Sequence, residues 1–145
     1  MQEYTVKVDD YGTKRWHQNG KLHRLDGPAI ECVGGTKRWY QNGKLHRLDG
    51  PAIEFADGTK FWYQNGKFHR LDGPAVEWSD GDKFWYQNDK LHRLDGPAIE
   101  CAGGTKKWYI DGVQVPEKEL NKRTKTCEGR VVEIDGVKYK LNKVS

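Results

Sequence analysis

Hydrophobic and polar residues alternate in short stretches along most of this chain. The stretch TKRWYQ at 36–41 alternates with the period of two that is typical of a β-strand, and it is rich in aromatic residues. Asn42-Gly43 follows it, and these residue types tolerate the positive φ angles of a type I′ hairpin turn. KLHR at 44–47 is therefore predicted to be the returning strand. AIEF at 52–55 is predicted to be a third strand, after a break at Asp49-Gly50-Pro51, because proline has no N–H to give to a ladder.

The same pattern recurs as a tandem repeat. The heptapeptide HRLDGPA begins at His23, His46, His69 and His92, which gives a unit of 23 residues. The sequence thus predicts four full repeats plus a truncated fifth over residues 13–112. The individual copies are 13–35, 36–58, 59–81, 82–104 and 105–112.

Non-repetitive segments flank the repeats at both ends. Residues 1–12 are predicted to form an N-terminal capping strand. Residues 113–145 are predicted to form a C-terminal cap, with a short helix at 116–123 and a hairpin at 130–141. Such caps are needed because the end faces of a repeat array otherwise invite end-to-end association.

These elements predict an all-β protein, a tandem array of 23-residue β-hairpin or meander repeats with a short C-terminal helix and a hairpin cap. Strand alternation sorts the side chains onto two faces. One face is predicted to carry a tryptophan ladder: Trp16, Trp39, Trp62, Trp85 and Trp108. The other is predicted to carry an aromatic and basic ladder: His17, Arg38, Tyr40, Phe61, Tyr63, Phe84, Tyr86 and Tyr109.

The repeat also carries a family resemblance. The phrase W-Y-Q-N-G-K-x-H-R-x-D-G-P-A, followed by Asp-Gly, resembles the MORN-type repeat. Residues 13–120 are more closely similar to the MORN-like arrays of bacteriophage and giant-virus proteins, whose last copies end in a pattern like that of 108–120 here. The resemblance implies an elongated, curved single sheet of hairpins, and it implies no single activity.

Composition and charge narrow the class of protein. Only 35% of the residues are hydrophobic, and the net charge of +4 comes from basic residues interleaved with acidic ones, which is unlike a nucleic-acid-binding arm. The three cysteines, Cys32, Cys101 and Cys127, have no metal-ligand spacing and are odd in number. Together with the lack of a long apolar run, this predicts a soluble cytoplasmic protein, in the host cytoplasm if viral, with no membrane association.

No set of residues typical of a catalytic site stands out, so the chain is predicted not to be an enzyme and to need no cofactor. Equivalent histidines of adjacent repeats should lie roughly 9–10 Å apart, too far to share a zinc ion, so no metal site is predicted. We expect each histidine to bond a turn carbonyl or the neighbouring aspartate. Cys32 and Cys101 are interpreted as small packing residues, and Cys127 is disfavoured as a nucleophile.

The arginines of the heptapeptide leave two interpretations open. The favoured one is structural: a bidentate pair with the aspartate two residues later, which would bracket the turn, or a contact with the next copy. The alternative is a row of phosphate or partner contacts. The arginines concerned are Arg24, Arg47, Arg70 and Arg93.

The aromatic and basic ladder is the strongest candidate for a binding surface, and the alternative is that it packs against a second layer. Identical units build a long surface rather than a single reactive point. The first hypothesis is a non-enzymatic binding protein of viral type, which binds and inhibits a host protein through the repeat face and the C-terminal tail. The alternatives are a sequesterer of a nucleotide signal or a binder of single-stranded nucleic acid, and a structural component that assembles into homo-oligomers.

Overall fold

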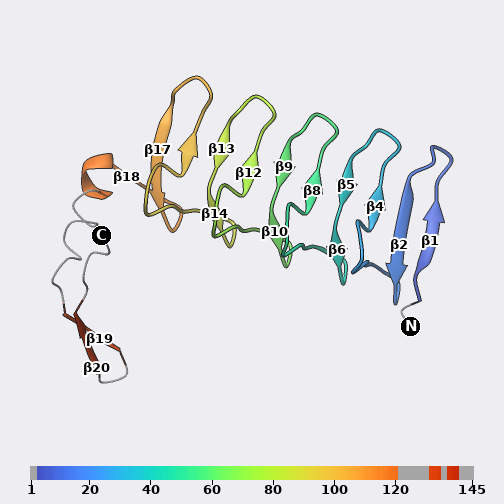
Figure 1. Ribbon diagram of the computed structural model, residues 1–145, viewed down its shortest axis with the longest axis horizontal. Coiled ribbons are helices and arrows are strands. Elements are labelled where there is room, and N and C mark those ends of the chain that lie inside the picture. The colour runs from blue at the N-terminus through green and yellow to red at the C-terminus, as the bar shows by residue number, and fades with distance from the viewer. Residues whose placement is uncertain (1–2, 121–130, 135–136, 141–145) are drawn as a thin grey trace.

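The computed structural model describes residues 3–120, 131–134 and 137–140. These residues form an almost all-β protein built on one long antiparallel sheet of short strands (Figure 1). The strands follow one another along the array in chain order, and one short helical turn follows them near the C-terminus. The predicted fold class is confirmed.

Each internal repeat contributes two strands to the long sheet and two to a small separate hairpin. The long sheet contains, in spatial order, β1 (Thr5–Val8), β2 (Lys14–Gln18), β4 (Ile30–Glu31), β5 (Lys37–Arg38), β8 (Ile53–Glu54), β9 (Lys60–Phe61), β12 (Val76–Glu77), β13 (Lys83–Phe84), β16 (Ile99–Glu100), β17 (Lys106–Ile110) and β18 (Val113–Val115), and β3 (Lys21–Leu22) pairs with β2. The small hairpins are β6 (Tyr40–Gln41) with β7 (Lys44–Leu45), β10 (Tyr63–Gln64) with β11 (Lys67–Phe68), and β14 (Tyr86–Gln87) with β15 (Lys90–Leu91).

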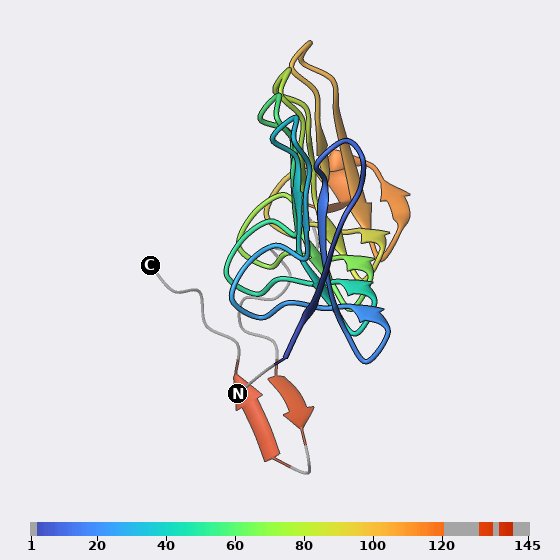
Figure 2. The same cartoon turned by 90° about the vertical axis from the view of Figure 1, so that its right-hand side faces the viewer.

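The predicted continuous strand at 36–41 is wrong in the internal repeats, because it breaks at the tryptophan. The Trp39 N–H donates to the carbonyl of Ala52 at 2.8 Å, and the Trp39 carbonyl accepts from the N–H of His46 at 3.0 Å. The returning strand is also shorter than predicted, since only Lys44–Leu45 is extended. Each internal unit therefore bends at its tryptophan, and the small hairpins diverge from the long sheet (Figure 2).

The register of the long sheet separates two chemically different faces. Residues directly opposite each other in an antiparallel pair share a face. One face is a ladder of alternating charge, which we call the Lys–Glu ladder: Lys14, Glu31, Lys37, Glu54, Lys60, Glu77, Lys83, Glu100 and Lys106. The opposite face carries Arg15, Ile30, Arg38, Ile53, Phe61, Val76, Phe84, Ile99 and Lys107.

The core is thin and repeats with the sequence. The alanine that ends each heptapeptide is completely buried at all four positions, Ala29, Ala52, Ala75 and Ala98. Its backbone also joins neighbouring units, because the Ala52 N–H donates to the Phe61 carbonyl at 2.8 Å. Stability therefore depends on contacts between adjacent repeats rather than on one central core.

The predicted type I′ turns are present. Asn42 has φ of 50° and Gly43 of 79°, and the equivalent residues of the other repeats are also in the left-handed region. In the fourth repeat Asp89 replaces the glycine and adopts φ of 64°. Its carboxylate accepts from the N–H of Phe68 at 2.7 Å, which offsets the conformational cost.

The ends of the array differ from its repeats. At the N-terminus β1 pairs with β2 over four residues. At the C-terminus residues 117–120 are helical and Leu120 is buried, while 121–123 of the predicted helix lie outside the described residues. β19 (Val131–Ile134) and β20 (Val137–Lys140) form an antiparallel hairpin within the predicted 130–141. No described helix is long and apolar enough to span a bilayer.

Candidate functional site

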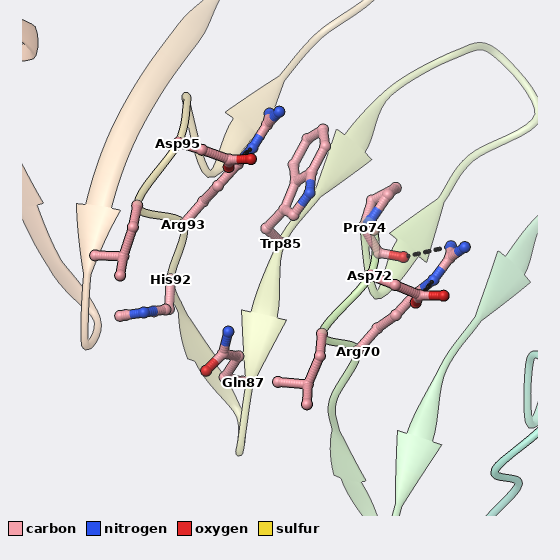
Figure 3. Close-up of a pocket in the computed structure, with 11 residues that line it drawn as sticks. Arg70, Asp72, Pro74, Trp85, Gln87, His92, Arg93 and Asp95 are labelled. Atoms are coloured by element: carbon pink, nitrogen blue, oxygen red, sulfur yellow. Dashed lines mark hydrogen bonds and ion pairs between the residues drawn. The ribbon is translucent and has the colours of Figure 1, made fainter. Parts of the chain in front are cut away.

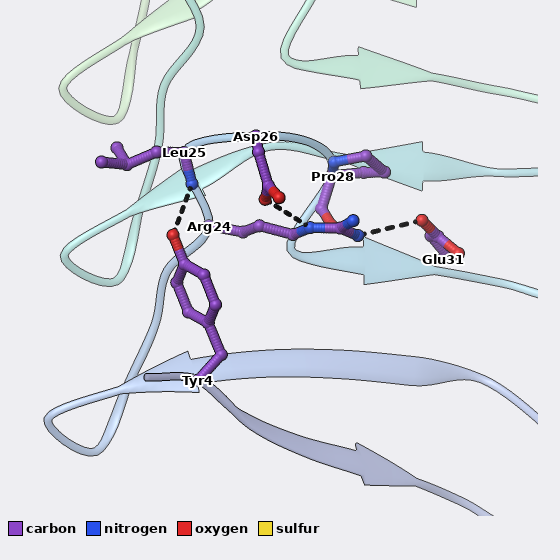
Figure 4. A network of polar contacts seen from close by, with 6 residues as sticks. All are labelled: Tyr4, Arg24, Leu25, Asp26, Pro28 and Glu31. Atoms are coloured by element: carbon purple, nitrogen blue, oxygen red, sulfur yellow. Dashed lines mark hydrogen bonds and ion pairs between the residues drawn. The ribbon is translucent and has the colours of Figure 1, made fainter. Parts of the chain in front are cut away.

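The recurrent HRLDGPA motif builds a stack around its arginine. The guanidinium carbon of Arg47 lies 3.9 Å from the centre of the Trp39 ring, and the other three copies repeat this contact. Arg47 Nε donates to Asp49 at 3.0 Å, and Nη1 donates to the Pro51 carbonyl and to Glu54. Figure 4 shows the same network around Arg24. The favoured Arg–Asp pair is thus present, but it uses one N–H of the guanidinium rather than two.

The glycine of the motif closes the other side of this stack. A Cβ added to Gly50 would lie 2.9 Å from the guanidinium carbon of Arg47, and the other three copies are equally tight. Arginine, tryptophan and glycine therefore recur together because a planar cation fits between an indole ring and a bare Cα. This packing is a structural reason for the motif.

The histidine of the motif joins one repeat to the next. His23 Nδ1 accepts from the N–H of Asn42 in the following turn at 3.0 Å, and His46, His69 and His92 make the equivalent bond. The predicted structural role is confirmed, but the predicted partner is wrong. The partner is a turn N–H of the neighbouring repeat, and at His92 the Nδ1 atom also lies 3.3 Å from the Asp111 carboxylate.

The arginine contacts use Nε and Nη1, two of the three guanidinium nitrogens that a phosphate could bind. The four arginine side chains are 20–22% exposed, whereas the paired aspartates are 73–86% exposed. The charge that the loops present to solvent is therefore mainly negative. A contact of Arg24, Arg47, Arg70 or Arg93 with phosphate stays a prediction.

Three residues of the predicted aromatic and basic ladder, Phe61, Tyr63 and Tyr86, belong to a group of rings in contact near the middle of the array. Phe61 lies edge-on to three rings, with centroids 5.2 Å away in Phe55, 5.8 Å in Phe68 and 5.1 Å in Trp78. Phe68 lies between Tyr63 at 4.2 Å and Tyr86 at 5.2 Å. We call this group the aromatic cluster: Phe55, Phe61, Tyr63, Phe68, Trp78 and Tyr86.

Most of the aromatic cluster departs from the repeat consensus. Phe61 stands where earlier copies have arginine, and Phe68 stands where the other full copies have leucine. Phe55 and Trp78 occupy the position of Cys32 and Cys101. Residues that differ from their equivalents in other copies thus contact one another, although they belong to separate repeats. Phe55, Phe68 and Trp78 were absent from the predicted ladder, although their difference from the equivalent residues of other copies was a usable signal.

The cluster changes the acid–base behaviour of its tyrosines. Burial, with a smaller effect of the nearby Asp89 carboxylate, raises the pKa of Tyr63 to about 12. Burial and Asp89 also raise the pKa of Tyr86. Both rings are nevertheless only partly buried, and Trp78 is 47% exposed. The cluster is therefore an apolar surface rather than a closed core.

The N-terminal half of the same face carries two polar atoms without partners. Arg38 Nε and His17 Nδ1 are buried, and neither has a hydrogen-bond partner among the described residues. Arg38 lies in register between Ile30 and Ile53. Among the other ladder residues, Phe84 lies on this face between Val76 and Ile99. Tyr40 lies opposite Leu45 in a small hairpin, and Tyr109 lies opposite Gln114 in β17 and β18. The ladder thus has an unpaired cationic end and an aromatic centre.

Other candidate chemistry is sparse in the part of the chain that the structure describes. Cys32 and Cys101 are free thiols at partly buried positions, and Cys127 lies outside the described residues. No group of three or more potential metal ligands is found among those residues. Comparison with models of protein families finds none that matches, and comparisons with curated proteins and with solved structures find no match either. The resemblance to MORN-like arrays therefore rests on the repeat motif itself.

Proposed function

We propose that the protein is a non-enzymatic binding protein whose partner is another protein, held on the aromatic cluster. The observation that carries this proposal is the convergence of Phe55, Phe61, Phe68 and Trp78, which are the residues that break the repeat. A purely architectural residue should recur in every unit, as the Arg–Trp–Gly stack does. Large aromatic side chains near the centre of a surface are typical of protein-binding hot spots.

The identity of the partner is a further part of the proposal. The resemblance to bacteriophage and giant-virus arrays favours a host protein, whose activity the bound array would inhibit. The C-terminal residues 113–145 extend beyond the repeats and would supply additional contacts.

The repeat itself provides variants for the test. Phe61→Arg and Phe68→Leu give the third repeat the residues that Arg38 and Leu45 provide in the second. Because the array already folds with these residues, the double variant should keep its circular dichroism spectrum. The unaltered chain should capture a stoichiometric partner from host lysate, and the double variant should not bind that partner. The matched control is Lys60→Gln with Gln64→Ser, which alters the residue before Phe61 in β9 and a residue of β10, the strand that pairs with β11.

Two results would count against this function. One is that the unaltered chain captures no stoichiometric partner. The other is that the Phe61→Arg, Phe68→Leu variant binds the captured partner as tightly as the control variant does.

Arg38 favours a second candidate, a nucleotide or single-stranded nucleic acid. Its guanidinium has no ion pair among the described residues, and it lies two residues before Tyr40, whose ring could stack on a base. Calorimetry at low salt with nucleotides, cyclic dinucleotides and short single strands tests this candidate. We expect Arg38→Met to abolish any heat of binding, and flat titrations of the unaltered chain would exclude it.

A further inference from the structure

The loops of the heptapeptides form a second surface, which we call the loop row: residues 24–28, 47–51, 70–74 and 93–97. These loops lie on the side of the Lys–Glu ladder, because Arg47 reaches Glu54 at 3.0 Å and Arg70 reaches Glu77 at 2.9 Å. The aromatic cluster belongs to the opposite side, since Phe61 is in register with Ile53 and Val76. The loop row is therefore separate from the proposed protein-binding cluster.

Adjacent loops enclose a series of equivalent pockets. Figure 3 shows the pocket between the third and fourth loops, with Trp85 between Asp72 and Asp95 and with Gln87 also in its lining. The same lining recurs one and two repeats earlier, around Trp62 and around Trp39. The volumes of the three pockets are about 560, 520 and 460 Å³. One repeating ligand could thus occupy all three.

The exposed charge around these pockets is negative. The side chains of Asp49, Asp72 and Asp95 are 85–86% exposed, and each arginine beside them is covered by its own tryptophan. The hydrogen bond from Arg47 holds the pKa of Asp49 below its ordinary value, and Arg70 does the same for Asp72. The charges of the Lys–Glu ladder beneath the loops alternate in sign, so they largely cancel one another. The row therefore offers ionised carboxylates at regular intervals.

Apolar groups accompany each carboxylate. Leu25, Leu48, Leu71 and Leu94 are 52–76% exposed at the loop tips. Each pocket also contains a partly exposed indole. Aromatic-lined pockets with carboxylates beside them suit a ligand that combines apolar rings with cations, as a proline-rich segment with basic residues does.

The spacing between the loops of the loop row favours one backbone conformation of a bound peptide. Two strands per repeat, at roughly 4.8 Å each, place successive loops about 9.6 Å apart. A polyproline II helix returns to the same side every three residues, or about 9.3 Å. An α-helix returns to the same side after about seven residues, or about 10.5 Å. Its repeat therefore departs from the loop spacing over four loops more than the repeat of polyproline II does. An extended β-strand repeats on one side at about 6.6 Å, which does not match.

From this geometry we infer that the loop row binds a basic, proline-rich segment of a partner protein in the polyproline II conformation. One Lys or Arg in every third residue pairs with the aspartate of each loop, such as Asp49 and Asp72. The intervening prolines pack on the tryptophans and leucines of the pockets, such as Trp62 and Leu71.

The test uses the whole chain and a synthetic peptide of four Pro-Pro-Arg triplets, with binding followed by fluorescence anisotropy. We expect saturable binding, weaker binding of a peptide with the same composition in scrambled order, and none of the Pro-Pro-Glu analogue. Asp49→Asn with Asp72→Asn keeps the acceptor for each arginine and should weaken binding about fivefold or more. The matched control is Asp57→Asn with Asp80→Asn, in the turns at the other end of the long-sheet strands, and its affinity should be unchanged.

A second variant guards against a change of fold. Leu48→Ser with Leu71→Ser alters only side chains that are 76% exposed, and it should also weaken binding of the Pro-Pro-Arg peptide. Equal affinity for the ordered and scrambled peptides, or equal affinity of the Asp49/Asp72 and Asp57/Asp80 variants, would overturn the inference. Phe61→Arg with Phe68→Leu should leave this affinity unchanged, so failure here and failure of the aromatic cluster are distinguishable.

Discussion

At the scale of single residues, the repeat motif is explained by packing. An arginine lies between an indole ring and a glycine Cα, and it carries two carboxylates and a carbonyl on its nitrogens. The contact of the arginine with the tryptophan and with the glycine recurs in every copy. Recurrence of the motif is therefore evidence of architecture, and the residues that vary between copies are better evidence of function.

Two glycine substitutions test the stack. Gly73→Ala should destabilise the protein by about 1–3 kcal/mol, because its new Cβ would lie 2.8 Å from the Arg70 guanidinium carbon. Gly34→Ala is the control, since no atom lies within 4 Å of its new Cβ, and it should be neutral or stabilising by about 0.4–1 kcal/mol. Urea unfolding followed by circular dichroism measures both, and equal effects would refute the stack.

A pair of arginine substitutions separates structure from binding. Arg38→Met should leave the free energy of unfolding unchanged or raise it, because Arg38 Nε is buried without a partner. Arg47→Met should lower it by at least about 1 kcal/mol, since it removes the ring contact and two ion pairs. The same urea series measures both variants. A larger loss for Arg38→Met than for Arg47→Met would contradict this account.

At the scale of the elements, adjacent hairpins are joined by an irregular ladder. The Arg24 N–H donates to the Tyr40 carbonyl at 3.1 Å, and the Gly43 N–H donates to the Leu22 carbonyl at 2.8 Å. Between these two bonds the imidazole of His23 accepts from Asn42, in the place of a backbone carbonyl. A side chain therefore completes the ladder where the backbone cannot.

His23→Phe tests this ladder, because it keeps a ring beside Tyr4 but removes the acceptor. The Asn42 N–H then lacks its partner in a part-buried position, and the cost should be about 1–3 kcal/mol. Hydrogen exchange should become faster at the Asn42 amide. The Asn88 amide, which bonds His69, is the internal control and should exchange as before. Unchanged exchange at Asn42 would show that the imidazole is dispensable.

The tyrosines of the aromatic cluster predict a loss of stability in alkali. The folded pKa of Tyr63 is about 12, against an ordinary 10.0, so the folded chain keeps a proton that the unfolded chain loses. This contribution is fully present below pH 10 and is lost as the pH rises through about 12. Tyr63→Phe should reduce the fall in stability between pH 9 and 11.5, measured by urea unfolding with ultraviolet titration of tyrosinate. An identical pH dependence in both proteins would contradict burial of Tyr63.

Local features of these elements could be predicted, and features that depend on a neighbouring repeat could not. Asn42-Gly43 specifies its turn through its own backbone preferences. The break at Trp39 was not predictable, because the alternation of side chains continues through it while the bond to Ala52 comes from a later segment. The partner of His23 lies 19 residues away in the next unit. The aromatic cluster depends on contacts between repeats, which the sequence does not show. The sequence showed only that some of its residues differ from their equivalents in other copies.

At the scale of the whole molecule, the long sheet of the array has two sides of different character. One side bears the aromatic cluster near its middle and the unpaired Arg38 towards its N-terminal end. The other side bears the Lys–Glu ladder and the loop row with its outward aspartates. Such a sheet presents much more surface for its length than a sandwich does, which suits a molecule that binds along its length.

Hydroxyl-radical footprinting of the captured complex tests most directly whether the partner binds on the aromatic cluster. Hydroxyl radicals label aromatic side chains, so labelling of the free chain and of the complex can be compared residue by residue. Binding through the aromatic cluster predicts lower labelling of Phe68 and Trp78, with no change at Tyr11, which is 87% exposed in the turn between β1 and β2. Undiminished labelling of Phe68 and Trp78 in a stoichiometric complex would contradict the proposal that this cluster is the binding site.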